Sequence, residues 1–368
     1  MKVPFVDLKS QYFSLKEEID STIKDVIENS LFIGGEKVRI FEENFAKKYG
    51  VKHCVSVANG TDAIYITLKM LGIGKGDEVI TTAHSWISTS ETISQTGATP
   101  IFVDVEEDFF TLDPNLMKDK ITSKTKAIIP VHLYGQMCDM EPILSIANEF
   151  GLYVIEDCAQ SHFSEYKGIR AGLFGNAGTF SFYPGKNLGA YGDAGCIITN
   201  SDELAQKVRM YANHGALKKH KHLIEGVNSR LDGIQAAILN VKLEHIISWT
   251  NKRSFNASIY DNELKDITGI SIPRVRKDTK HSFHLYVIRV KERDKLKDFL
   301  SNKGISTAIH YPTALPLLPA YEYLGYVSSD IPITTSNQHQ ILSLPMFPEL
   351  TKEQIVYIAS CIKDFYLL

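Results

Sequence analysis

The chain has 368 residues, of which 44% are hydrophobic, and this is enough for one large globular domain and a smaller companion. Forty basic against forty-three acidic residues leave a net charge of −3, which favours small-molecule chemistry over nucleic-acid or membrane partners. The five cysteines are scattered without a CxxC pair, so reduced thiols are favoured over disulfides or structural zinc.

Two features of the sequence, its N-terminal residues and its apolar runs, indicate where in the cell the protein is expected. Residues 1–7 lack the apolar core and the small-residue cleavage site of a signal peptide. No window approaches the apolar length that a membrane span needs. We therefore expect a cytoplasmic protein.

The first two hundred residues predict most of a large domain. Helical patterns over 15–27 and 39–49 flank a glycine turn at Gly34–Gly35, and we expect this part to close over a ligand or a partner subunit. Short apolar runs then alternate with helical patterns, which predicts a mainly parallel sheet with flanking helices. The expected strands are 54–58, 78–81, 100–104, 127–131, 153–156, 178–182 and 196–199, and helices are expected to begin near Thr61 and Glu141.

Apolar residues at helical spacing over 231–247 predict a long helix that leads out of this domain. We expect residues 1–248 to form the N-terminal segment and the large domain, and 249–368 a small α+β domain. The small domain should contain a strand over 284–290, a charged helix over 293–303 that ends at Gly304, and a last helix over about 352–365. The predicted fold class is α/β.

A lysine and a carboxylate each follow an apolar strand. Lys186 follows the alternating run 180–183, which Pro184–Gly185 ends abruptly, so its amine should project at the rim of the sheet, where α/β proteins bind ligands. A neutral lysine amine in a partly dry site condenses with aldehydes such as pyridoxal 5′-phosphate (PLP). PLP also needs an anion beside its pyridine nitrogen, and Asp157, after the run 152–155, is placed to supply it.

Polar and aromatic side chains nearby extend this pattern, and each has a plain structural alternative. Gly60 and Thr61 join a strand to a helix N-terminus that suits a phosphate, although an ordinary N-cap turn looks similar. Ser181 offers a hydroxyl to a second phosphate oxygen or faces solvent. Trp86 stacks on a flat pyridine ring or packs in the core. Gln160 donates to the PLP phenolic oxygen or caps the next segment.

The sequence lacks the motifs that are typical of other kinds of active site. His220 and His222 have ligand-capable spacing, but the surrounding lysines favour a solvated loop, so no metal site is expected. The sequence has no G-x-G-x-x-G after a strand, no G-x-x-x-x-G-K-[ST] and no G-x-S-x-G. Nicotinamide, nucleotide-hydrolysis and serine-hydrolase functions are therefore not predicted.

Taken in order, these residues resemble the DegT/DnrJ/EryC1/StrS family of PLP-dependent sugar aminotransferases. The resemblance covers nearly the whole chain and is carried by ordered blocks at 3–8, 32–35, 131–135, 156–162, 181–189, 192–195 and 310–312. It implies the aspartate aminotransferase fold, fold type I of the PLP-dependent transferases. It also implies a homodimer with active sites at the subunit interface, and amino transfer from L-glutamate to a nucleotide-linked ketosugar.

The resemblance assigns roles around the cofactor ring by position. Lys186 matches the Schiff-base lysine and Asp157 the partner of the pyridinium nitrogen. Gln160 matches the contact to the phenolic oxygen, and Trp86 the residue that stacks on the ring. Some relatives replace the lysine with histidine and act as dehydratases, so the retained Lys186 favours transamination.

Phosphate and sugar contacts follow in the same way. Gly60, Thr61 and Ser181 match phosphate contacts, and Asn228 matches a residue that reaches the phosphate from the other subunit. The candidate contacts to the sugar or its pyrophosphate are Tyr183, His162, Arg230, His310 and Tyr311.

The run 225–235 and Trp86, which stands where Phe is usual, resemble the branch that acts on C3 of dTDP-linked 3-oxo-6-deoxyhexoses. The resemblance is to the transaminases that form 3-amino-3,6-dideoxy-glucose or -galactose precursors of surface polysaccharides. The alternative is a C4 aminotransferase on a UDP- or GDP-linked 4-keto-6-deoxyhexose. The choice between the gluco and galacto epimers stays open, and so does the amino donor.

The implied mechanism has two halves. Lys186 holds PLP, gives it up to glutamate and moves the Cα proton to the cofactor, leaving 2-oxoglutarate and pyridoxamine 5′-phosphate. The reverse shuttle then aminates the sugar ketone, and Asp157 keeps the ring nitrogen protonated. A regulator that binds PLP or a nucleotide sugar without turnover is a different class of function, but it would not need Lys186 and Asp157 together.

Overall fold

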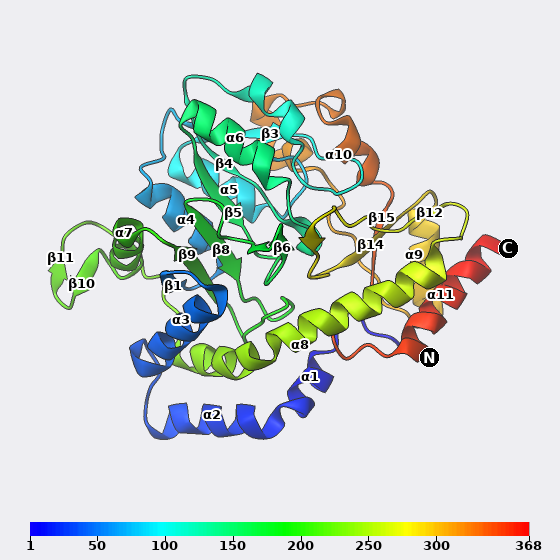
Figure 1. The fold of residues 1–368 in the computed structure, drawn as a ribbon, viewed down its shortest axis with the longest axis horizontal. Helices are drawn as coiled ribbons and strands as arrows, with labels where there is room; N and C mark the ends of the chain where they lie inside the picture. Colours follow the sequence, from blue (N-terminus) through cyan, green and yellow to red (C-terminus); the bar gives the residue numbers. More distant parts are fainter. Residues whose placement is uncertain (368) are drawn as a thin grey trace.

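The computed structural model describes residues 1–367, and a seven-stranded sheet lies at its centre (Figure 1). The strand order is β1-β9-β8-β5-β4-β2-β3. The neighbours from β8 to β3 pair in parallel, and β9 is antiparallel to both β8 and β1. The seven strands are β1 (His53–Val57), β2 (Glu78–Thr82), β3 (Thr99–Val103), β4 (Thr125–Ile129), β5 (Tyr153–Asp157), β8 (Ala177–Ser181) and β9 (Gly195–Thr199). The mainly parallel sheet and all seven expected strands are confirmed.

Helices cover both faces of this sheet. Along β2, Val79 packs into the cluster under α4 (Gly60–Met70) and α5 (Ser88–Thr96), whereas Ile80 faces the opposite cluster. That opposite cluster joins α3 (Gly35–Tyr49) and α6 (Met140–Phe150) to the first half of α8, and α7 (Asp202–Ala212) lies beside α4. Alternating apolar residues are thus buried on both sides, as expected of strands between two helix layers.

The helix α8 (Gly233–Leu264) runs on far beyond the expected end near residue 247 and reaches the C-terminal part of the molecule (Figure 1). Its second half buries polar side chains at Thr250, Arg253 and Asn256. Each of them is hydrogen-bonded to a backbone carbonyl, which makes their burial possible. The helix crosses residues 248 and 249 without a break, so the division of the chain there stays a prediction.

The C-terminal part has its own sheet and core. Its antiparallel sheet has the order β12-β14-β15, with β14 (Tyr286–Val290) in the middle. The strand and the two helices expected here are confirmed as β14, α9 (Arg293–Asn302) and α11 (Lys352–Leu367). The neighbours β12 (Ile270–Ser271) and β15 (Ile341–Leu344) were not predicted. Tyr260 and Leu264 of α8 pack into the same core.

The N-terminal helices precede α3, and the second of them packs along α8. They are α1 (Leu8–Ser14) and α2 (Lys16–Glu28), and α2 and α3 lie against α8 (Figure 1). The shorter elements are β6 (Glu165–Tyr166), β7 (Ile169–Arg170), β10 (Ala216–Lys218), β11 (Lys221–His222), β13 (Thr279–Lys280) and α10 (Pro332–Asn337). None of the helices within residues 1–367 has the length and apolar character needed to cross a bilayer.

Candidate active site

A cavity of about 610 Å³ opens where the central parallel strands end. The ends of β5 and β8 and the first turns of α4 and α5 form one side of it, and loops of the C-terminal part form the other. Ten of the thirteen predicted site residues line it. They are Gly60, Thr61, Trp86, Asp157, Gln160, Ser181, Tyr183, Lys186, His310 and Tyr311.

Lys186 lies in a turn just after β8. Its backbone N–H donates to the Tyr183 carbonyl at 2.8 Å, which closes the turn that the Pro184–Gly185 pair predicts. Burial lowers the pKa of Lys186 to about 8, and the nearby charge of Asp157 only partly opposes this effect. The side chain has no ion-pair partner within residues 1–367. The neutral amine is therefore far more abundant near neutral pH than it is for an ordinary lysine, although the ammonium form still predominates.

Asp157 ends β5 and is buried, with two donors on opposite oxygens. The Thr89 hydroxyl donates to its Oδ2 at 2.8 Å, and the Ala159 N–H donates to its Oδ1 at 3.1 Å. Ser85 Oγ lies 3.0 Å from the Thr89 hydroxyl. The carboxylate is thus held in one orientation at the cavity wall. Sequence reasoning missed Thr89, although its position three residues after Trp86, at a helix start, was a usable signal.

The start of α4 has the features of an anion site. Asn59 caps the helix by accepting the Asp62 N–H at 2.8 Å, which leaves the first amides, at Gly60 and Thr61, facing the cavity. An added Cβ at Gly60 would lie 2.6 Å from the Ser181 Cβ, so only glycine permits this close approach of helix and strand. Helix N-termini favour anions, and the Ser181 hydroxyl lies beside this one. The three residues together fit a phosphate.

Aromatic groups and an amide bound the rest of the cavity. The Trp86 ring is 57% exposed at its mouth, and its centroid lies 5.6 Å from that of Tyr311. Gln160 donates to the Tyr311 hydroxyl at 3.0 Å and accepts the Tyr134 N–H at 2.7 Å, so its amide orientation is fixed. A flat ring placed between Trp86 and the sheet fits these walls.

A buried hydrogen-bonded cluster supports β5 from behind. Glu156 accepts the backbone N–H groups of Gly172, Phe174 and Gly175 as well as His132 Nε2 at 2.9 Å. Cys158 completes the only group of side chains with metal-ligand geometry within residues 1–367. Because the Glu156 oxygens are already occupied by donors and burial raises the pKa of Cys158, we interpret the cluster as a structural cross-link.

Asn228 and Arg230 do not reach this cavity. Both are exposed, whereas Ser229 between them is buried and donates to Asp62 Oδ2 at 2.6 Å. The Ser229 hydroxyl also accepts the Ala58 N–H at 3.0 Å. Ser229 therefore anchors this segment to the first turn of α4 in its own chain. The side chains of Asn228 and Arg230 on either side of it are exposed to solvent.

His162 is also absent from the cavity wall. It is fully buried and packs against Phe180 and Phe182, and its ring nitrogens have no hydrogen-bond partner within residues 1–367. Burial lowers its pKa to about 3. A side chain enclosed in this way cannot touch a sugar without rearrangement of the core, so we do not propose His162 as a substrate contact.

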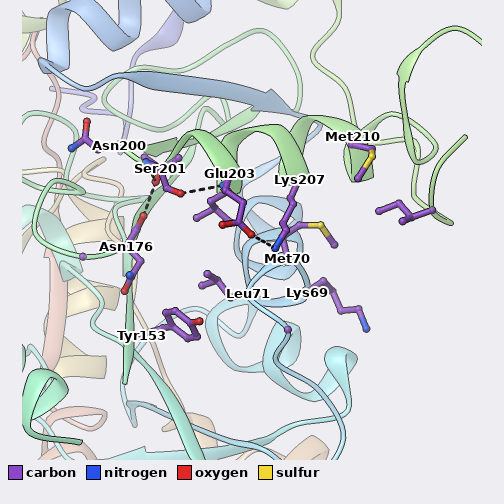
Figure 2. Close-up of a pocket in the computed structure, with 15 residues that line it drawn as sticks. Lys69, Met70, Leu71, Tyr153, Asn176, Asn200, Ser201, Glu203, Lys207 and Met210 are labelled. Carbon is purple, nitrogen blue, oxygen red and sulfur yellow. Dashed lines mark hydrogen bonds and ion pairs between the residues drawn. The ribbon is translucent and has the colours of Figure 1, made fainter. Parts of the chain in front are cut away.

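A second hollow of about 670 Å³ lies at the other end of the sheet (Figure 2). It is lined by Tyr153, which begins β5, and by Thr199, which ends the antiparallel β9. Most of its polar groups are already paired, and the Lys69 amine is an exception within residues 1–367. Lys207 pairs with Glu203 at 2.6 Å (Figure 2). The Asn176 side chain accepts the Val154 N–H. Nothing in it corresponds to Lys186 or Asp157.

A lysine of lowered pKa, a fixed carboxylate and a helix N-terminus thus meet in one cavity of an α/β sheet. This combination defines a PLP-dependent enzyme of the aspartate aminotransferase fold. The DegT/DnrJ/EryC1/StrS aminotransferase family matches residues 14–363, and the chain belongs to this family. The fold, cofactor and reaction class expected from the sequence are therefore confirmed.

Individual relatives cover the whole chain. The chain is 46% identical to a pleiotropic regulatory protein of Geobacillus stearothermophilus, over 100% of this chain and 99% of the relative. It is 41% identical to dTDP-3-amino-3,6-dideoxy-alpha-D-galactopyranose transaminase of Aneurinibacillus thermoaerophilus, over 99% of each. It is 40% identical to UDP-2-acetamido-2-deoxy-3-oxo-D-glucuronate aminotransferase of Pseudomonas aeruginosa, over 98% and 100%. The structure of S. venezuelae DesV in complex with a ketimine intermediate matches with a TM-score of 0.97 at 40% identity, over 99% and 98%.

Proposed function

We propose that this aminotransferase moves the amino group of L-glutamate to C3 of a dTDP-3-oxo-6-deoxyhexose. The single observation that carries the chemistry is Lys186 facing Asp157 beside the N-terminus of α4. Support for the sugar comes from the Aneurinibacillus thermoaerophilus relative and from the resemblance of the run 225–235 to the C3 branch. The UDP-sugar relative at nearly equal identity makes the nucleotide the first point to test.

Each cavity residue has a task in this proposal. When bound, PLP supplies an electrophilic carbon and an electron-withdrawing ring. Lys186 would hold that carbon through its neutral amine and, once released, would carry a proton from and to the substrate carbon. Asp157 would hold the ring nitrogen in its protonated form, and Trp86 would pack against the ring. Gln160 donates to the phenolic oxygen with its remaining amide hydrogen.

The phosphate and the sugar use separate parts of the cavity. The amides of Gly60 and Thr61 and the Ser181 hydroxyl bind the phosphate. Tyr183 and Tyr311, at the mouth and the wall of the cavity, are the proposed sugar contacts together with His310. Burial, together with the charge of Lys186, lowers the pKa of His310 to about 4, so it acts as a neutral hydrogen-bonding group.

We propose a homodimer in which Asn228 and Arg230 serve the partner subunit. Both side chains are exposed, although the backbone between them is fixed by the buried Ser229. The adjoining hairpin also exposes Leu217, Leu223 and Ile224, which a second copy would cover. A monomer with full activity at nanomolar protein concentration would contradict this part of the proposal.

The test is end-point mass spectrometry with PLP, glutamate and separate ketosugars. We expect a ketone-to-amine mass change with dTDP-3-oxo-6-deoxyglucose or its galacto epimer, and none with UDP- or GDP-linked 4-ketosugars. Product from a 4-ketosugar alone would keep the PLP chemistry and overturn the C3 assignment. Failure to convert any sugar, with glutamate still converted to 2-oxoglutarate, would favour another amino acceptor or a regulatory role.

A further inference from the structure

The C-terminal part contributes a cavity residue that has no role in the function proposed above. His284 lines the cavity together with Leu285 and Met346. Its position is fixed from behind, because the buried Arg253 guanidinium donates to the carbonyls of Phe283, His284 and Met346. The ring therefore faces the site on a rigid support.

The tautomer of this ring follows from its neighbours. His284 Nδ1 lies 3.1 Å from Asn187 Oδ1. The Asn187 amide cannot be reversed without cost, since its Nδ2 donates to the Ser282 carbonyl at 3.1 Å and a carbonyl only accepts. Nδ1 is therefore the ring nitrogen that carries hydrogen. Burial, with the charges of Lys186 and Arg253, holds the pKa of His284 well below its usual value, so Nε2 is unprotonated.

We propose that His284 is a specificity residue of the sugar subsite, where its Nε2 accepts a hydrogen bond from a hydroxyl next to the sugar ketone. Nε2 is the ring nitrogen left for the cavity, and it has no hydrogen-bond partner within residues 1–367. This inference rests on the proposed transfer to a ketosugar and names the group that selects the acceptor.

The hydrogen-bond donors that the two substrates carry show which of them His284 Nε2 can bind. Glutamate has one donor group, its ammonium, and that group is consumed at the cofactor, which leaves two carboxylates that only accept. The lone pair at Nε2 cannot form a hydrogen bond with these carboxylates, because both groups are acceptors. A 3-oxo-6-deoxyhexose has hydroxyls at C2 and C4 on both sides of the ketone, and each is a donor. His284 thus acts on the second half of the reaction and leaves the first half unaffected.

The first experiment separates the two half-reactions of the holoenzyme. We expect His284→Phe to lower kcat/KM for the ketosugar about tenfold, with the glutamate half-reaction unchanged. His284→Gln, which keeps an oxygen acceptor near the position of Nε2, should recover most of the loss, and His339→Phe, at an exposed histidine outside the cavity, should match wild type. Equal slowing of both half-reactions in His284→Phe would overturn the proposal.

The second experiment uses substrates that lack one hydroxyl, the 2-deoxy and 4-deoxy forms of the ketosugar. Wild type should prefer the full substrate over one of them by about fivefold to tenfold, and His284→Phe should show no such preference. A preference that survives in His284→Phe would contradict the assignment.

The tautomer can be measured without any sugar, which keeps this inference testable even if the proposed substrate is wrong. In ¹⁵N spectra of the holoenzyme, the resonances lost in His284→Gln should report a protonated Nδ1 and an unprotonated Nε2. A proton on Nε2 would overturn the inference whatever the substrate. Absence of sugar conversion by wild type, with this tautomer found, would instead place the error in the proposed function.

Discussion

Two hollows of similar volume lie at opposite ends of one sheet, and only one of them has the means to do chemistry. The cavity of about 610 Å³ contains Lys186 without an ion-pair partner and a carboxylate in a fixed orientation. In the hollow of about 670 Å³, Lys207 pairs with Glu203 and the Asn176 amide accepts a backbone N–H (Figure 2). The second lysine of this hollow, Lys69, has no buried carboxylate in the same lining. Volume therefore does not identify a site, whereas a polar group left free at the carboxyl ends of parallel strands does.

The largest expected effect is at Lys186. Lys186→Ala removes both the amine that binds the cofactor and the proton carrier, so transamination should fall by more than about 1,000-fold. Turnover of glutamate and ketosugar, followed by 2-oxoglutarate release, measures it. Near-wild-type turnover in this variant would remove the basis for placing the chemistry in this cavity.

A loss of similar kind but smaller size is expected at Asp157. Asp157→Ala removes the anion that holds the ring nitrogen protonated, and the rate should fall by about 100-fold to 1,000-fold. Some PLP should stay bound through Lys186 and the α4 N-terminus, which absorbance of the bound cofactor will show. A rate within threefold of wild type, with PLP bound, would exclude the assigned role.

Thr89 provides a finer test, because it lines the cavity and its hydroxyl donates to Asp157. Thr89→Val removes one donor to the carboxylate, and we expect about tenfold weaker PLP binding to the apoenzyme. Thr89→Ser keeps the hydroxyl and should restore the affinity. If both variants weaken binding equally, or if the unfolding temperature of the apoenzyme falls in parallel, Thr89 has a packing role only.

The pH dependence of PLP association tests whether the pKa of Lys186 is lowered in this cavity. The pKa of Lys186 is lowered to about 8, so its amine is mostly ammonium below that pH and mostly neutral above it. The association rate of PLP with the apoenzyme should therefore rise several-fold between about pH 7 and about pH 9 and then level off. A rate that continues to rise toward about pH 10.4, the ordinary lysine value, would show that burial does not depress this pKa.

The smallest effect is expected in the hollow at the other end of the sheet. Lys207→Ala breaks an exposed pair with Glu203, so stability should change by less than about 1 kcal/mol. Activity and PLP affinity should equal those of wild type. A loss of activity here would mean that the second hollow contributes to function after all.

The parts of the fold and site that the sequence predicts are those coded locally. Lys186 follows a strand that Pro184–Gly185 terminates, and the alternation of strand residues between two helix layers leaves a clear pattern. The second half of α8 leaves no such pattern, since Arg253 and Asn256 are polar side chains that the helix buries against the carbonyls of residues distant in the sequence. Periodicity cannot reveal a partner that is supplied by tertiary structure.

The same limit explains the site residues that were missed or misplaced. Thr89 and His284 acquire meaning only when folding brings them to Asp157 and Asn187. His162 lies in a block that resembles the family, and its burial behind Phe180 cannot be read from the block itself. The two-residue strands are too short to show any period.

The most direct test of the central claim is to fix PLP to its lysine with borohydride and map the modified peptide by mass spectrometry. We expect to find the pyridoxyl mass on Lys186 and none on the Lys186→Ala variant. Modification at Lys69 or Lys207, which line the other hollow, would contradict this expectation and would move the chemistry to the opposite end of the sheet.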